Sequence, residues 1–305
     1  MISVIIPVYN EQGNLVQLHA RLSEVMRSSQ QGYELVFIND GSRDGSLAII
    51  QQLAGEDSNV RYIDLSRNFG HQIAVSAGLD QCGGEAAVII DADLQDPPEL
   101  INEMLIRWKN GDQVVYAQRI SRKGESRFKK WTAGMFYRIL RMLTNVDIPI
   151  DTGDFRLIDR SIIDLLKDMP EKNKFLRGQI AWMGFNQSSV EYVREERHSG
   201  SSGYSFGKML KLAMDGITSF SNVPLRLVTA FGFLCSFVAF IIMVYAIYAK
   251  YAWSDTVPGW ASLMVSVLFL GGVQMLALGV IGEYLSRIND NARGRPLYII
   301  RDKNF

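Results

Sequence analysis

The 305-residue sequence has little cysteine, little histidine and no net charge, and each shortage excludes a class of protein. Its two cysteines, Cys82 and Cys235, lie far apart, so the disulfide framework typical of small secreted domains is not indicated. A balance of 32 basic and 32 acidic residues gives no overall positive field for a nucleic acid polymer. The opening segment MISVIIPVYNE lacks the basic and apolar regions of a signal peptide, so we expect a strand to begin at once.

Two long runs near the C-terminus contain no charged residue: Leu227–Ala249 and Thr256–Gly282. About 20 apolar residues suffice for a helix to cross a bilayer, and neither run shows the polar stripe of a long core helix. We therefore predict transmembrane helices at 226–250 and 259–284, joined by a short external loop at 251–258. A buried helical hairpin of a soluble protein is the alternative.

Basic residues flank these two runs on the side away from the loop. Arg226 precedes the first run, whereas Arg287, Arg293 and Arg295 follow the second. The positive-inside rule then places both termini in the cytoplasm. We also expect a juxtamembrane amphipathic helix at 205–225 and a cytoplasmic tail at 285–305. Small residues in the second run would suit packing of the two helices or of a homo-oligomer.

The first half of the chain alternates short apolar runs with helical patterns. Strands are predicted at Ser3–Val8, Glu34–Ile38, Val60–Leu65, Ala86–Ile90 and Gln113–Ala117, and helices at Asn14–Ser28, Ser46–Leu53, Gln72–Leu79 and Pro98–Trp108. This alternation predicts an α/β domain at 1–204 with a doubly wound, mainly parallel sheet. Because such sheets bind ligands beyond the carboxyl ends of their strands, the residues after each strand are the candidate site.

The pair Asp91 and Asp93 follows the fourth predicted strand and is the strongest local signal. Mg²⁺ and Mn²⁺ prefer oxygen ligands and often reach proteins through one or two carboxylates plus substrate phosphates. Gln95 offers one further oxygen, and Asp96 is placed to cap the helix that follows. A D-x-D pair is common, and a solvated loop is the alternative, but the position at a strand end favours a metal site.

Polar residues follow the other strands as well. Asp40 offers acceptors for a base N–H or a ribose hydroxyl, and Glu11 lies within reach of the same ligand. Pro7 would shape the first of these loops. Arg67 and Asn68 follow the third strand and would face the base. The sequence thus predicts a nucleotide site along this edge of the sheet.

Two later segments also carry charge in a suggestive pattern. Asp154 and Arg156 lie close together in IPIDTGDFRLIDR, which we expect between two structural elements. Arg197 precedes a Gly/Ser-rich loop at Ser199–Gly203 that would fold over phosphate, because the arginine fork matches phosphate oxygens. An exposed basic loop near acidic lipid headgroups is the alternative for this segment.

PVYNE, NDGS, SRNFGHQ, DADLQDPPE, TGDFRL and R-x-x-R-x-x-G-x-S occur in this order before the two apolar runs. Together they resemble glycosyltransferase family 2, and within it the polyprenyl-phosphate glycosyltransferases, over nearly the whole chain. The resemblance implies a GT-A fold, a nucleotide-diphosphate sugar donor, a Mg²⁺ or Mn²⁺ cofactor and inversion at the anomeric carbon. It also implies a polyprenyl-phosphate acceptor, and so a multi-pass protein of the inner (plasma) membrane with its catalytic domain in the cytoplasm.

The resemblance also implies a role for individual residues. The nucleotide sugar would be bound by Pro7, Tyr9, Glu11, Asp40, Arg67, Asn68, Asp91, Arg197 and Ser202. The metal would be held by Asp91, Asp93 and Gln95, the reaction centre would contain Asp154, Arg119 and Asp93, and the acceptor phosphate would meet Arg119, Lys129, Lys130 and Arg156. Gly203 stands where the family usually has lysine, so one expected phosphate contact is missing.

The expected reaction moves a hexose from the nucleotide to undecaprenyl phosphate, with glucose and UDP favoured by the resemblance. Mannose, galactose and aminosugars remain alternatives. A phosphate monoester has its second pKa near 6, so the attacking phosphate is mostly dianionic at neutral pH. We therefore expect charge neutralisation and positioning to carry the catalysis, with Asp154 as an orienting group rather than a base.

Other functions fit the sequence less well. A processive polysaccharide synthase typically has a Gln-x-x-Arg-Trp segment, and Gln179–Trp182 lacks the arginine. A non-catalytic membrane scaffold would not need the intact carboxylate pair. A transporter should carry charges within its spans, which these runs lack. A dehydrogenase is disfavoured because PVYNEQGN is not a glycine-rich dinucleotide fingerprint.

Overall fold

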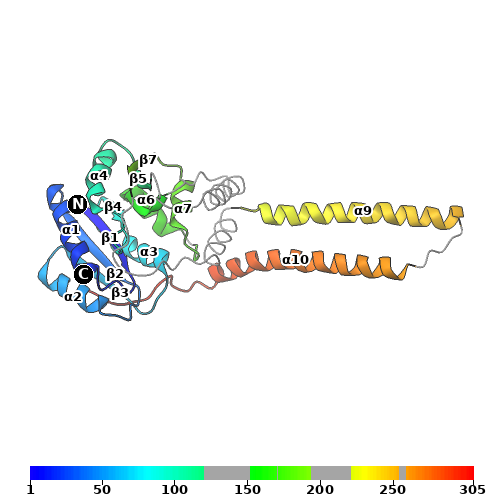
Figure 1. Ribbon diagram of the computed structural model, residues 1–305, viewed down its shortest axis with the longest axis horizontal. Helices are drawn as coiled ribbons and strands as arrows, with labels where there is room; N and C mark the ends of the chain where they lie inside the picture. Colours follow the sequence, from blue (N-terminus) through cyan, green and yellow to red (C-terminus); the bar gives the residue numbers. More distant parts are fainter. Residues whose placement is uncertain (120–151, 170, 194–220, 254–258) are drawn as a thin grey trace.

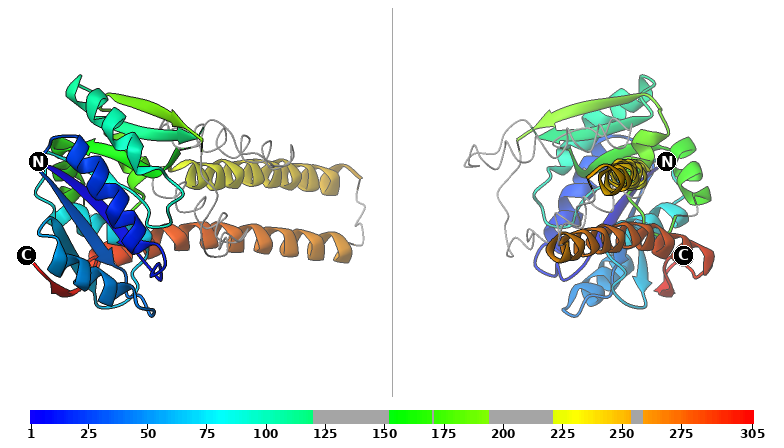
Figure 2. Two further views of the ribbon diagram at one scale, coloured as in Figure 1. Left: turned by 60° about the vertical axis from the view of Figure 1, so that its left-hand side comes forward. Right: turned by 90° about the vertical axis from the view of Figure 1, so that its right-hand side faces the viewer.

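The computed structural model describes residues 1–119, 152–169, 171–193, 221–253 and 259–305. An α/β domain stands at one end, and two long helices run side by side away from it (Figures 1 and 2). These helices are α9 (Val223–Trp253) and α10 (Trp260–Ala292), and both extend beyond the predicted spans. Residues 205–220 of the expected juxtamembrane helix lie outside the described residues.

In the described part of the chain, eight strands form one sheet in the order β7-β5-β6-β4-β1-β2-β3-β8. They are β1 (Ile2–Val8), β2 (Tyr33–Asn39), β3 (Val60–Leu65), β4 (Ala86–Ile89), β5 (Val114–Arg119), β6 (Thr152–Asp159), β7 (Gln187–Tyr192) and β8 (Ile300–Lys303). The four central strands are parallel, whereas β6 runs antiparallel to β4 and β5, and β8 runs antiparallel to β3. The predicted α/β class is confirmed, with a mixed rather than parallel pairing towards both edges.

Helices cover both faces of this sheet (Figure 1). One face packs against α1 (Leu15–Ser28), α2 (Ser46–Glu56) and α4 (Ile101–Lys109), and the other against α3 (His71–Gln81), α6 (Arg160–Asp168) and α7 (Leu176–Trp182). A short 3₁₀ turn, η1 (Pro98–Leu100), precedes α4. Val4 and Ile6 of β1 enter the first core, whereas Ile5 enters the second, because side chains alternate along a strand. Because helices cover both faces of the sheet, we expect a ligand to bind only where the strands end.

The strand β6 was not expected, since its sequence was interpreted as a segment between two structural elements. Successive side chains of β6 point to opposite faces of the sheet, but the charged residues interrupt the apolar pattern by which a strand is predicted from sequence. Phe155 and Leu157 are buried in one core, whereas Asp154 and Arg156 share the opposite face with the buried Ile158. Because β6 is antiparallel to β4, its first residues lie at the edge where β4 ends. That direction brings the TGDF segment to the Asp91 loop.

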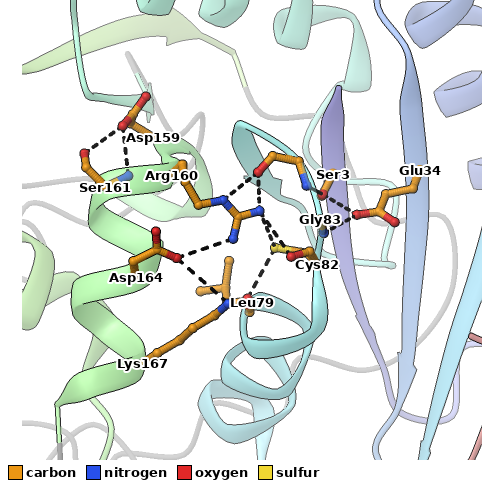
Figure 3. Close-up of polar contacts among 11 residues, drawn as sticks. Ser3, Glu34, Leu79, Cys82, Gly83, Asp159, Arg160, Ser161, Asp164 and Lys167 are labelled. Carbon is orange, nitrogen blue, oxygen red and sulfur yellow. Dashed lines mark hydrogen bonds and ion pairs between the residues drawn. The ribbon is translucent and has the colours of Figure 1, made fainter.

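A buried polar network joins the opposite edge of the sheet, where β2 begins (Figure 3). The Glu34 carboxylate accepts the backbone N–H of Gly83 at 2.8 Å, and Arg160 Nε donates to the carbonyl of Gly84 at 2.7 Å. Arg160 also donates to the carbonyl of Cys82 at 3.1 Å, and burial raises the pKa of the Cys82 thiol. A protonated, buried thiol is a poor nucleophile, so we assign Cys82 no chemical role. The hydrogen bonds of Arg160 and Glu34 connect α3 and α6 to the sheet.

The turn after β2 depends on a glycine. Gly41 has a φ of +65°, and a Cβ there would lie 2.6 Å from backbone atoms of both Arg67 and Asn68. Because backbone atoms cannot move aside as a flexible side chain does, the turn and the loop after β3 fit together only with glycine.

We expect Gly41→Ala to lower the free energy of unfolding by about 1–3 kcal/mol through this clash and the positive φ. Gly55→Ala is the matched control, because a Cβ on Gly55 in α2 meets no atom within 4 Å. Alanine favours a helix over glycine, so the control should be unchanged or slightly stabilised. Thermal and denaturant unfolding measure both variants, and equal stability of the two would contradict the argument.

Candidate active site

Loops that follow the parallel strands bond to one another at the carboxyl edge of the sheet. Asp40, after β2, accepts the backbone N–H of Phe69 at 2.7 Å and that of Gly70 at 2.9 Å. Burial raises the pKa of Asp40, and these two amide bonds oppose that rise. Asp40 is itself buried, so it shapes the loop after β3; its predicted contact with the nucleoside stays a prediction.

A cavity of about 240 Å³ lies among the loops after β1, β2 and β3. Its lining includes Tyr9, Ser42, Arg43, Arg67, Asn68 and Arg301. Tyr9 is 44% exposed, so it offers aromatic surface on which a base can stack. Three of the lining residues are arginines, and none of the described residues that line the cavity is acidic. Tyr9, Arg67 and Asn68 of the predicted nucleotide set thus come together here.

Two other members of that set lie beside the cavity rather than in its lining. Pro7 is buried within β1. The Glu11 carboxylate accepts from the side-chain amide of Asn14 at 2.6 Å, and its backbone N–H donates to Ser46 Oγ at 3.0 Å. Both residues therefore support the first loop in this structure.

The loop after β4 holds the predicted metal ligands in a strained conformation. Leu94 adopts a left-handed φ of 58° although its side chain is almost fully buried. This conformation costs a non-glycine residue about 1–2 kcal/mol, and it recurs at functional loops. The backbone N–H of Gln95 donates to Asp93 at 3.1 Å and fixes that carboxylate. The packing of Leu94 thereby sets where the two aspartates lie.

Asp154 on β6 lies at the centre of a cluster of charged side chains. Arg177 Nε donates to one Asp154 oxygen at 2.8 Å, and His71 Nε2 lies 3.1 Å from the other. The same His71 nitrogen lies 3.6 Å from Asp91 Oδ1. The histidine at the start of α3 therefore joins a carboxylate of the β4 loop to one of β6.

These contacts decide the protonation of the cluster. Burial alone would raise the pKa of Asp154, but Arg177 and His71 hold it well below its usual range. Burial lowers the pKa of His71, and Asp91 and Asp154 more than reverse this, raising it to about 9. Burial raises the pKa of Asp91 to about 6. At neutral pH the histidine is therefore cationic and both carboxylates are mainly ionised.

The residues present fit a divalent cation. Asp91 Oδ1 is buried and, although the His71 nitrogen lies 3.6 Å away, it accepts no hydrogen bond from the described residues, so it keeps its lone pairs for a metal ion. No group of three or more His, Cys, Asp or Glu side chains in the described residues is arranged to hold a metal ion. Asp91 and Asp93 would therefore need further oxygen ligands, as in sites where substrate phosphates complete the coordination.

Arg119, at the end of β5, lies next to this cluster. Its Nε donates to the hydroxyl of Tyr192 at 3.0 Å, and that hydroxyl donates to Asp96. The expectation that Asp96 caps the following helix is wrong, because η1 has no side-chain cap and Asp96 is buried against Tyr192. A Cβ on Gly153 would lie 2.8 Å from Arg119, so the guanidinium packs against the residue preceding Asp154.

The remaining predicted residues are less accessible or are not described. Arg156 is nearly buried and donates to the carbonyl of Gly153 at 3.0 Å, and burial lowers its pKa to about 10. Its predicted contact with the acceptor phosphate stays a prediction. Lys129, Lys130, Arg197 and Ser202 lie outside the described residues.

Two residues of the cluster, His71 and Arg177, were not among the predicted site residues. His71 stands in the SRNFGHQ segment, where the order of the motifs was a usable signal. Arg177 lies in α7, and only the packing of α7 against the face that carries Asp154 brings it to the site. No local pattern in the sequence marks that contact.

Comparison with known proteins identifies the family. The model described as Glycosyl transferase family 2 matches residues 3–166, more than half of the chain. The chain belongs to glycosyltransferase family 2. The enzyme class and the GT-A-type α/β fold predicted from the resemblance are thereby confirmed. A second model, described as the GtrB C-terminal hairpin, matches residues 223–288 of this glycosyltransferase.

Full-length relatives are also similar to this family 2 chain. It is 53% identical over 299 residues to the uncharacterized glycosyltransferase YkcC of Bacillus subtilis, covering 98% of this chain and 93% of the relative. It is 41% identical over 300 residues to a prophage bactoprenol glucosyl transferase homolog of Escherichia coli, covering 98% of each. A solved mannosyltransferase of Pyrobaculum calidifontis, in complex with GDP-Man and Mn²⁺, is 17% identical with a TM-score of 0.45, covering 93% of this chain and 86% of that one.

Removing Arg177 should make the glycosyltransferase more sensitive to acid. Arg177→Met takes away a cation that opposes the effect of burial, so the pKa of Asp154 rises towards its ordinary value. Since the wild-type carboxylate stays ionised as the pH falls, the acid limb of the variant's kcat/KM profile moves to higher pH. The exposed pair partner Arg107 on α4 supplies the control Arg107→Met. Superimposable profiles for Arg177→Met and wild type would refute the electrostatic assignment.

Proposed function

We propose that this protein transfers glucose from UDP-glucose to undecaprenyl phosphate at the cytoplasmic face of the inner membrane, with inversion at the anomeric carbon. The relatives named bactoprenol glucosyl transferase, about 40% identical over the full chain, support the sugar and the acceptor. The observation that carries the proposal is the meeting of Asp91 and Asp154 at the carboxyl ends of the strands, along which an arginine-lined cavity also lies.

The donor would lie along this edge. Its nucleoside occupies the cavity by Tyr9 and Arg67, and its diphosphate lies at the β4 loop. Mg²⁺ or Mn²⁺ held by Asp91 and Asp93, with Gln95 as a further ligand, would neutralise charge on the departing nucleoside diphosphate. The anomeric carbon then lies near Asp154, which His71 and Arg177 hold in one orientation.

The main barrier is repulsion between the acceptor phosphate and the donor diphosphate. Two unit charges at 4 Å repel by about 4 kcal/mol at an effective dielectric constant of 20. Arg119 packs against Gly153, next to Asp154 on β6, and would offset part of this repulsion. Lys129, Lys130 and Arg197 are proposed to offset it further. Because the acceptor is already dianionic, the residues chiefly position and neutralise charge.

The two helices would hold the domain at the surface where this acceptor lies. Stretches at Val223–Ile242 and Val265–Ala292 are long and apolar enough to cross a membrane, and none of the side chains described in them is buried. The large apolar side chains Phe233 and Leu276 are each 74% exposed, which argues against the alternative of a buried soluble hairpin. Anchoring restricts the search for a lipid phosphate to a surface and raises its effective concentration.

The proposed topology follows the charge distribution. Residues 1–204 form the catalytic domain, and both termini lie in the cytoplasm, with 251–258 as the external loop. The C-terminal strand β8 pairs with β3 of the catalytic domain, so the tail and the domain must share one side of the membrane. This pairing supports an even number of spans between them.

The test is formation of the glycolipid by the purified full-length chain in nanodiscs. Labelled nucleotide sugars would be supplied with undecaprenyl phosphate, with and without EDTA, and the product identified by mass. We expect glucosyl-phosphoundecaprenol from UDP-glucose, lost with EDTA and restored by Mn²⁺ or Mg²⁺. Asp91→Asn should reduce the metal-dependent rate by about 100- to 1000-fold. Asp168→Asn, at an exposed residue near the end of α6, is the control. If no nucleotide sugar yields a glycosylated polyprenyl phosphate, the proposal is wrong.

The role of Asp154 is tested separately by Asp154→Asn, which keeps an acceptor for His71. An orienting role predicts a rate lower by about 100-fold, because a small misplacement of the reacting groups has effects of that size. The shape of the pH–rate profile near neutrality should match wild type. Loss of one ionisation from that profile would identify Asp154 as a general base instead.

A further inference from the structure

The chain does not end at the membrane helices but returns to the sheet. After α10 it reaches β3, where β8 pairs in antiparallel register and the backbone N–H of Ser66 donates to the carbonyl of Ile299 at 2.9 Å. The Tyr298 hydroxyl donates to Asp80 on α3 at 2.9 Å, and Lys303 Nζ donates to Gln81 at 2.8 Å. Figures 1 and 2 show the C-terminus beside the sheet, far from the helix tips. The tail is thus an integral edge of the catalytic domain.

One residue of this edge, Arg301, lines the same cavity as Tyr9 and Arg67. Its Nη2 donates to the carbonyl of Ser66 at 2.6 Å, and its Nη1 lies 3.5 Å from Asp64. A guanidinium carries five N–H donors in a rigid fork, so these contacts with described residues leave donors for a ligand. The contacts also fix the guanidinium at the cavity, which lowers the entropy lost when a ligand binds.

The order of the strands indicates that this cavity binds the nucleoside end of the donor, away from the sugar. From the metal carboxylates after β4, the carboxyl edge passes through β1, β2 and β3 to β8. With neighbouring strands about 4.8 Å apart, β3 lies about 14 Å from β4. A diphosphate at Asp91 and Asp93 therefore leaves the nucleoside to extend towards the loop at Ser66, which places its base nearest Arg301.

The charged groups around the cavity determine which base fits. Arg43, Arg67 and Arg301 present donors only, and no acidic side chain of the described residues lines the space. A base edge with carbonyl oxygens matches such a lining, in the way that arginine recognises O6 and N7 of guanine. A base with an exocyclic amino group at that edge would place donor against donor.

Resting on the proposed function, we propose that Arg301 of the C-terminal strand binds the carbonyl edge of the donor's base and so selects a uracil nucleotide over a cytosine nucleotide. The residue is a specificity determinant that reaches the site only through the chain segment beyond the second membrane helix. Donor selection is thereby coupled to the docking of the tail on β3.

The test measures the affinity of the full-length protein in nanodiscs for UDP, CDP and uridine with Mn²⁺ present. UDP and CDP share the ribose and the diphosphate and differ at base positions 3 and 4, where uracil has an N3–H and the O4 acceptor and cytosine has an N3 acceptor and an amino donor. We expect wild type to prefer UDP, and Arg301→Met to bind UDP and uridine about 10- to 100-fold more weakly, with CDP nearly unchanged. Arg301→Lys, which keeps the charge without the fork, should recover part of the UDP affinity.

Lys303→Met is the matched control on the same strand, because its ammonium bonds Gln81 and not the cavity. It should leave UDP affinity unchanged, and the unfolding midpoints of ligand-free Arg301→Met and wild type should agree within a few degrees. Equal UDP affinity in Arg301→Met and wild type overturns the inference. A loss for UDP without a loss for uridine also overturns it, since Arg301 would then contact the diphosphate. Failure of wild type to bind any of these nucleotides rejects the proposed function itself.

Discussion

The rest of this structure depends on opposite charges that meet in a partly exposed cluster at the carboxyl ends of the strands. Asp91 and Asp154 come from adjacent strands that run in opposite directions, and His71 lies between them. Two carboxylates so close would repel in a poorly hydrated site unless cations compensate them. His71 and Arg177 supply that compensation from α3 and α7. The antiparallel insertion of β6 is therefore a requirement of the site, since a parallel β6 would deliver Asp154 to the opposite edge.

The tail that follows α10 joins the helix hairpin to the lateral strand β3 of the sheet. The tail after α10 hydrogen-bonds to β3 and to α3, so the helix hairpin is joined to the domain at its end as well as its beginning. The Tyr62 hydroxyl donates to Asp302 at 2.7 Å, and the Tyr62 backbone N–H donates to the side chain of Asn304 at 2.8 Å. These contacts hold β8 against the loops that line the cavity. A movement of the hairpin would consequently displace Arg301 at the cavity where we propose that the nucleotide binds.

Much of this arrangement was predictable because its signals are local. The strands β1 to β4 and their helices follow from apolar periodicity, and the rule for parallel sheets then placed Tyr9, Asp40, Arg67 and Asp91 at one edge. The remainder depends on contacts between distant segments. β6 was missed because Asp154 and Arg156 interrupt its apolar pattern, and β8 was missed because IRDK has almost no apolar face. Arg177 and Arg301 reach the site only through tertiary packing, and the spacing of residues in the sequence does not predict that packing.

The central claim is that Asp91 and Asp93 bind a cation whose coordination is completed by a diphosphate. Electron paramagnetic resonance of Mn²⁺ titrated into the full-length protein tests this most directly. The account predicts weak Mn²⁺ binding to the protein alone and binding at least about tenfold tighter when UDP is present, with broadening from ¹⁷O-labelled phosphate oxygens. Mn²⁺ binding that is equally weak with and without UDP, or unaffected in a protein lacking both carboxylates, would contradict it.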